Sequence, residues 1–152
     1  MNATITELKK YFDIRELVCP DAHRKFGEIA WQFFRPQLLE TLLIIRRDIL
    51  KTGMTVNNWS SGGQFGQRGL RCNLCQIVRD NSTKGLIYLS AHCEGAAIDF
   101  DNKIYTAEQT RGIIADHADL LPFPIRLEQN VNWCHIDVYD SGSNKKVNYF
   151  TV

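Results

Sequence analysis

Residues 90–99 read Ser-Ala-His-Cys-Glu-Gly-Ala-Ala-Ile-Asp, and residues 133–137 read Trp-Cys-His-Ile-Asp. The two stretches offer an imidazole at His92, a carboxylate at Asp99 and a second imidazole at His135, each in or beside a short apolar run. Two imidazoles and one carboxylate suit a divalent zinc ion, and three protein ligands leave the fourth position of such a site open. We therefore expect these three residues to bind one zinc ion.

The residues between His92 and Asp99 are small, and Gly95 lies among them. Small residues let the backbone of this loop-to-strand segment pack closely, so that both side chains can point into one cleft. Asp99 ends the short apolar run 96–98. Alone, each of these residues is typical of an ordinary core or turn position, so the prediction rests on their combination.

The second stretch is predicted to be a strand. Alternation along a strand places Trp133, His135 and Asp137 on one face, and it turns Cys134 toward the other face, where we expect it to pack in the core. Asp137 can orient the imidazole of His135 by a hydrogen bond from behind the metal.

The chain has 152 residues and a formal net charge of +1. Its length fits one domain, residues 1–152, with its own core. The near-neutral charge gives no reason to expect a nucleic-acid partner. Residues 1–7 lack the pattern of a secretory signal, and no apolar run reaches membrane-spanning length. We expect a soluble monomer that is synthesised in the cytoplasm.

The predicted elements form a helical front half that is followed by an antiparallel sheet. Asp13 and Glu16 form a capping pattern, Pro36 begins a long apolar helix that stops at Gly53, and Thr106 with Gln109 caps a helix that ends before Pro122. Strands are expected at 54–59, before the glycine-rich loop 60–69, and at 124–128 and 133–139, which read as a hairpin. The pattern predicts the α+β class, with helices packed on a small antiparallel sheet.

The five cysteines are an odd set, which argues against a framework of disulfides. Cys72 and Cys75 form a Cys-x-x-Cys pair without a second pair at matching spacing. The pair can be half of a structural zinc site, a redox pair, or two reduced thiols in a packed segment. We favour the packed thiols.

The motif resembles that of peptidase family M15, the zinc D-Ala-D-Ala carboxypeptidases and L-alanyl-D-glutamate endopeptidases. The family pattern Ser-x-His-x-x-Gly-x-Ala-x-Asp followed by Trp-x-His is matched by Ser90, His92, Gly95, Ala97 and Asp99, and then by Trp133 and His135. Residues 11–17 also look like the family's N-terminal segment. The resemblance implies the zinc peptidase fold shared with hedgehog-like domains, and hydrolysis of peptidoglycan stem peptides. The sequence leaves open which bond is cut.

The resemblance also implies an upstream arginine that contacts the substrate carboxylate or the developing oxyanion. Arg68, with Asn73 five residues on, matches the expected spacing best, and Arg71 is the near alternative. An arginine fork suits a carboxylate because it can bond both oxygens at once. Ser90 and Trp133 are expected to contact the substrate, and Tyr88 or Trp133 can form the wall of the cleft.

The general base departs from the family pattern. Several members carry an acidic residue three positions before the last histidine, where this chain has Asn132, and an amide cannot accept a proton from water. Glu128 ends the preceding strand, and the hairpin would bring it near the metal, so we expect Glu128 to be the base.

The leading hypothesis is therefore an active zinc peptidase, which would reach the wall after lysis, as a phage endolysin does, or by delivery in a larger assembly. Asn132 keeps a second hypothesis open, a catalytically impaired zinc-binding domain that serves a structural or wall-binding role. A third is a metal-free domain whose histidines are structural.

Overall fold

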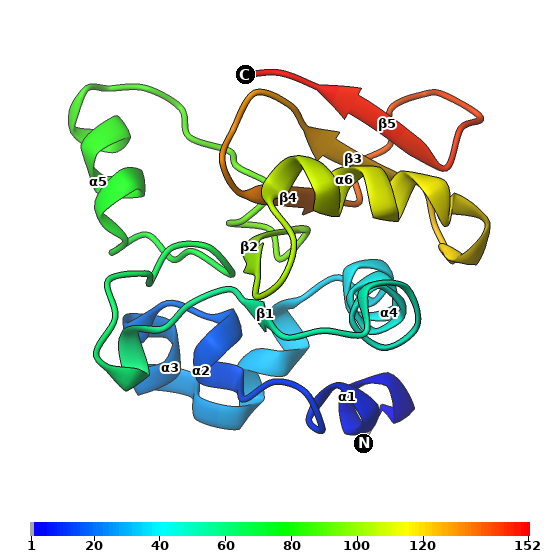
Figure 1. Ribbon diagram of the computed structural model, residues 1–152. Coiled ribbons are helices and arrows are strands. Elements are labelled where there is room, and N and C mark those ends of the chain that lie inside the picture. Colours follow the sequence, from blue (N-terminus) through cyan, green and yellow to red (C-terminus); the bar gives the residue numbers. More distant parts are fainter. Residues whose placement is uncertain (1) are drawn as a thin grey trace.

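Helical segments make up most of the first part of the chain, and four of the five strands lie in the last part, in the computed structural model, which describes residues 2–152 (Figure 1). The α-helices are α1 (Ala3–Leu8), α2 (Ile14–Leu17), α3 (Pro20–Phe26), α4 (Pro36–Ile44), α5 (Gln76–Thr83) and α6 (Ala107–Asp116). Shorter helical segments are η1 (Gly27–Phe33), η2 (Ile45–Leu50), η3 (Trp59–Ser61) and η4 (Ala118–Leu120). The strands are β1 (Met54–Thr55), β2 (Ala97–Asn102), β3 (Ile125–Glu128), β4 (Cys134–Asp137) and β5 (Val147–Phe150).

The strands form one sheet in the order β1-β2-β4-β3-β5. All neighbours are antiparallel except β3 and β5, which run parallel. The expectation of a purely antiparallel sheet is therefore wrong at this edge, because the C-terminal segment returns beside β3 as a strand that the sequence did not signal. The single small domain mixes helix and sheet, which is compatible with the predicted α+β class.

The predicted helix signals are confirmed at three places. Asp13 and Glu16 form a reciprocal capping box at the start of α2, and Thr106 and Gln109 form another at the start of α6. The helix that begins at Pro36 runs through α4 and continues as the π-helical segment η2. It ends where Lys51 adopts a left-handed conformation, just before Gly53.

The strand expected at 54–59 is shorter than predicted, because β1 ends at Thr55. Beyond it, side-chain amides bond to the glycine-rich loop instead of a neighbouring strand. Asn57 Oδ1 accepts the backbone N–H of Arg68 at 3.0 Å, and Asn58 Oδ1 accepts that of Phe65 at 2.9 Å. Helix α5 was not predicted, and it stands at one side of the molecule after this loop (Figure 1).

The apolar core is formed by helices α1 to α4 and the inner face of the sheet, with α6 packed against β2, β4 and η2. A smaller cluster of Ala91, Ala96 and Ala97 lies beside the turn that carries His92. Within residues 2–152, no helix is long and apolar enough to cross a membrane.

Gly95 ties this turn to the helical half of the molecule. Its φ is +62°, and a Cβ placed there would lie 2.1 Å from the carbonyl oxygen of Phe33. Its own carbonyl accepts the N–H of Arg35 at 2.9 Å. Only glycine fits a left-handed position with backbone so close, so the small residues of the motif do allow the tight packing expected of them.

Candidate metal centre

Two neighbouring strands and one turn bring the predicted ligands together. Asp99 on β2 lies directly opposite His135 on β4 in the antiparallel register, and the turn that precedes β2 carries His92. The ligand atoms of the three residues all lie within 4.8 Å of one another. Their exposed fractions are 3% for His92, 6% for Asp99 and 7% for His135. The carboxylate is central, with Oδ1 2.7 Å from His135 Nδ1 and Oδ2 3.2 Å from His92 Nε2.

The other nitrogen of each imidazole has a fixed partner. His92 Nδ1 lies 3.0 Å from the carbonyl oxygen of Gly69, which can only accept, so Nδ1 donates and Nε2 faces Asp99. His135 Nε2 lies 3.0 Å from Asp137 Oδ2 and donates to it, while Nδ1 faces Asp99. Partners of this kind set the tautomer and ring orientation of metal-binding histidines.

Asp137 is itself held in place. Its carboxylate is 1% exposed and accepts both Nε and Nη2 of Arg126, at 2.8 and 2.9 Å. The backbone N–H of Tyr139 donates a further bond to Asp137 at 3.1 Å. A buried carboxylate with an arginine fork stays ionised, and it can therefore accept from His135 in every state of the site.

The pKa values of the three candidate ligands depend on burial and on the bonds between them. Burial alone would raise the pKa of Asp99, but its bonds with His135 and His92 hold that pKa well below its usual range. Burial lowers the pKa of His92. Burial also disfavours charge on His135, but Asp137 and Asp99 outweigh it and raise its pKa to about 9. One carboxylate and two imidazoles are a donor set that a divalent metal ion such as zinc accepts.

A cavity of about 480 Å³ adjoins the three residues. Besides the candidate ligands, it is lined by Arg71, Ile77, Tyr88, Leu89, Ser90, Ala91, Arg126, Glu128, Trp133, Asp137, Tyr139, Phe150 and Val152. Ser90, Trp133 and Glu128, which were predicted from the sequence, thus lie in one cleft with the candidate ligands. Asn132 is exposed and is not a lining residue.

Of the two candidate arginines, Arg71 faces the cleft. Its Nη2 lies 3.5 Å from Asp99 Oδ2, its Nη1 donates to the Tyr88 hydroxyl at 2.7 Å, and its Nε donates to the carbonyl of Gln67 at 2.6 Å. These bonds hold the guanidinium beside the candidate ligands. Tyr88 lies in the cleft wall and also positions this arginine.

Arg68, the residue preferred from spacing, has other partners. Its Nη1 pairs with Asp101 at 2.6 Å, and its guanidinium lies 3.7 Å from the centre of the Phe65 ring. It is not among the residues that line the cleft. Its carbonyl oxygen, however, accepts the N–H of Asp99 at 2.7 Å, so its backbone supports a candidate ligand.

Sequence reasoning missed several residues of the cleft, among them Arg126 and Phe150. Arg126 lies two positions before Glu128 on β3, and strand alternation could have assigned both to one face. Phe150 lies on the unpredicted strand β5 and has no such signal. Its ring centre lies 5.5 Å from that of His135 and 4.4 Å from the guanidinium of Arg126.

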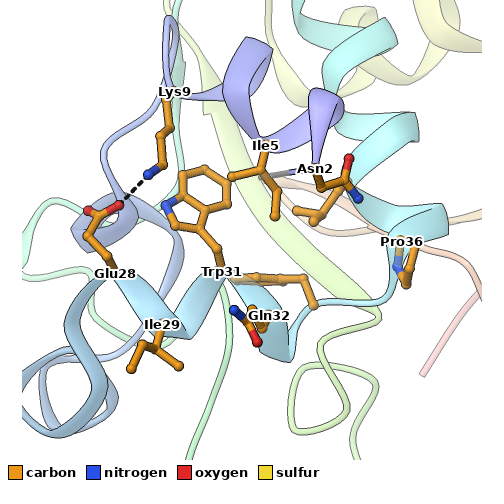
Figure 2. Close-up of a pocket in the computed structure, with 10 residues that line it drawn as sticks. Asn2, Ile5, Lys9, Glu28, Ile29, Trp31, Gln32 and Pro36 are labelled. Atoms are coloured by element: carbon orange, nitrogen blue, oxygen red, sulfur yellow. Dashed lines mark hydrogen bonds and ion pairs between the residues drawn. The ribbon is translucent and has the colours of Figure 1, made fainter.

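A second cavity, of about 470 Å³, lies among α1, η1 and α4 (Figure 2). Lys9 and Glu28 on its rim are paired at 2.6 Å, and the Trp31 ring lies between this pair and Ile5. No histidine or cysteine lines this cavity. Since its ionisable groups neutralise each other, we take the cleft at the sheet as the candidate functional site.

Comparison of the chain with protein-family models, with curated proteins and with solved structures gives no match.

Proposed function

We propose that the protein is a zinc-dependent peptidase that hydrolyses peptide bonds in peptidoglycan stem peptides. The observation that carries this proposal is the convergence of His92, Asp99 and His135 in a cleft that also contains Glu128 and Arg71. The substrate class rests on the resemblance of the motif at residues 90–99 and 133–135 to peptidase family M15.

The chain supplies the groups that hydrolysis needs. His92, Asp99 and His135 would hold zinc, which when bound polarises a water and lowers its pKa toward about 7. Glu128 accepts a proton from the attacking water and passes it to the nitrogen of the leaving amine as the C–N bond breaks. Within residues 2–152 no side-chain hydrogen bond or ion pair occupies its carboxylate, which lines the cleft.

Arg71 is the cleft arginine in this proposal, in place of Arg68. Its guanidinium is nearly buried and prepositioned by Tyr88 and Gln67, so little conformational freedom is lost when it binds an anion. A substrate carboxylate or the oxyanion of the tetrahedral intermediate suits this donor. Ser90 and Trp133 offer a hydroxyl and an aromatic surface to the peptide beside it.

Replacement of the base tests the proposal. We expect Glu128→Gln to lower the release of amines from peptidoglycan by about 100- to 10,000-fold, the range for loss of a general base, while the zinc content is unchanged. Glu40→Gln is the matched control, because Glu40 is a glutamate on α4 that lies outside the cleft. An active Glu128→Gln protein would show that another group is the base.

A second candidate function is a zinc-binding domain that recognises wall peptides without cutting them. Asn132, at the position where several M15 members have their acidic base, favours it. In that case the wild-type protein and Glu128→Gln would be equally inert with zinc bound, and both would still be retained on purified peptidoglycan.

A further inference from the structure

Three cysteines from two separate parts of the chain meet at the junction between the helices and the loop before α5. Cys19 immediately precedes α3, and Cys72 and Cys75 lie in the loop that leads into α5. Their sulfur atoms lie within 4.8 Å of one another. Cys19 and Cys75 are buried, and Cys72 is partly buried. The sequence shows the Cys-x-x-Cys pair, but only the fold reveals the third thiol.

The backbone fixes these three positions firmly. Cys19 donates its N–H to the carbonyl of Leu70 at 3.1 Å, and Leu70 donates to Leu17 at 2.8 Å. The turn between the other two cysteines is closed by the N–H of Cys75, which donates to the carbonyl of Cys72 at 3.1 Å. The cluster is therefore preformed and does not depend on long, mobile side chains.

One backbone N–H group donates to a sulfur atom of the cluster. The N–H of Leu74 donates to Cys72 Sγ at 3.4 Å. Thiolate is the form of cysteine that binds metals.

We propose that Cys19, Cys72 and Cys75 hold a structural zinc ion, a second metal site separate from the cleft. Three convergent sulfur ligands, two of them in a Cys-x-x-Cys turn, match the ligand type and spacing of structural zinc sites. A disulfide would use two of the thiols and leave the third buried beside it. Cys75 also lines a cavity of about 250 Å³.

A zinc ion at the cysteine site would stabilise the loop that contacts His92 in the cleft. The residues just before Cys72 pair with the segment that ends at Cys19, and they include Gly69 and Arg71. The carbonyl of Gly69 orients His92, and the N–H of Arg71 donates to the carbonyl of His92 at 3.2 Å. Zinc bound by the three thiolates would join this segment to α3 and α5. The inference does not depend on the proposed peptidase activity.

Metal analysis of the purified, reduced protein tests the inference. We expect two zinc ions per chain in the wild type and one in the double variant His92→Ala/His135→Ala, which keeps only the cysteine site. In that double variant a mercurial thiol reagent should release the remaining zinc. Replacement of that zinc ion by cobalt should give intense sulfur-to-cobalt charge-transfer absorption in the near ultraviolet.

Cys72→Ser should lose one zinc and the charge-transfer band, whereas Cys93→Ser, which removes a cysteine outside the cluster, should keep both. If Cys72→Ser does not fold, the mercurial and cobalt measurements on the histidine variant still decide. A histidine variant without zinc or cobalt would overturn the inference, as would a disulfide between any two of the three cysteines. Neither result would bear on the cleft, whose zinc is measured in the cysteine variant or the wild type.

Discussion

At the scale of single residues, the candidate centre depends on partners that lie behind the ligands. Asp99 bridges two imidazoles, and the far nitrogen of each imidazole donates to a fixed acceptor, Gly69 or Asp137. Such partners fix the tautomer before a metal arrives, so that little reorganisation is needed on binding. The affinity for zinc should therefore respond to residues that do not touch it.

Asp137→Asn tests this role. The amide keeps the size of the side chain but removes the charge that orients His135 and pairs with Arg126. We expect the dissociation constant for zinc to rise by about 10- to 100-fold, measured by competition with a chromogenic chelator. Asp101→Asn is the control, because Asp101 pairs with Arg68 outside the cleft. An unchanged zinc affinity in Asp137→Asn would show that His135 needs no carboxylate behind it.

Zinc binding should also release a proton. Since Asp137 and Asp99 raise the pKa of His135 from 6.5 to about 9, its charge stabilises the metal-free fold below pH 6.5, and this stabilisation is lost as the pH rises through about 9. At pH 7 the proton on His135 must leave before zinc can bind, so zinc affinity should increase from pH 7 to about 9. Calorimetry in buffers of different ionisation enthalpy measures this proton, and a buffer-independent heat would contradict the assignment.

At the scale of elements, local signals predicted some features well and tertiary contacts decided the others. The capping boxes at Asp13 and Thr106 depend only on residues three positions apart, so the sequence contains them in full. Strand β5 lies in a polar C-terminal segment and exists because β3 offers a parallel partner. The choice between Arg68 and Arg71 depends on the path of the loop, which spacing does not encode.

The turn that carries His92 is sensitive to substitution at Gly95. Gly95→Ala would combine a left-handed φ with a contact of 2.1 Å to a backbone oxygen, and neither can relax cheaply. Gly142→Ala is the matched control, since its φ is +69° and it has open space around it. We expect the control to lose about 1 kcal/mol of unfolding free energy from φ strain alone, and Gly95→Ala to lose clearly more. Equal losses in urea unfolding would show that the turn can move away from Phe33.

At the scale of the whole molecule, the loop before α5 joins the two halves. One side of it pairs with Leu17 and Cys19 in the helical half, and the other contacts His92 and Asp99 beside the sheet. The motif at 90–99 and 133–137 could be found in the sequence because its residues are close in number or on one strand. The cluster around Cys19 could not, because its parts meet only when this loop folds back.

The central claim is that the cleft cuts wall peptides with a zinc ion held by His92, Asp99 and His135. The most direct measurement is the release of amines from purified peptidoglycan by the zinc-loaded protein, before and after removal of the metal with a chelator. We predict release that stops with the chelator and returns when zinc is added back. Zinc-loaded protein that releases no amines from walls of several chemotypes would contradict the claim, and the cleft would then be a binding site rather than an active site.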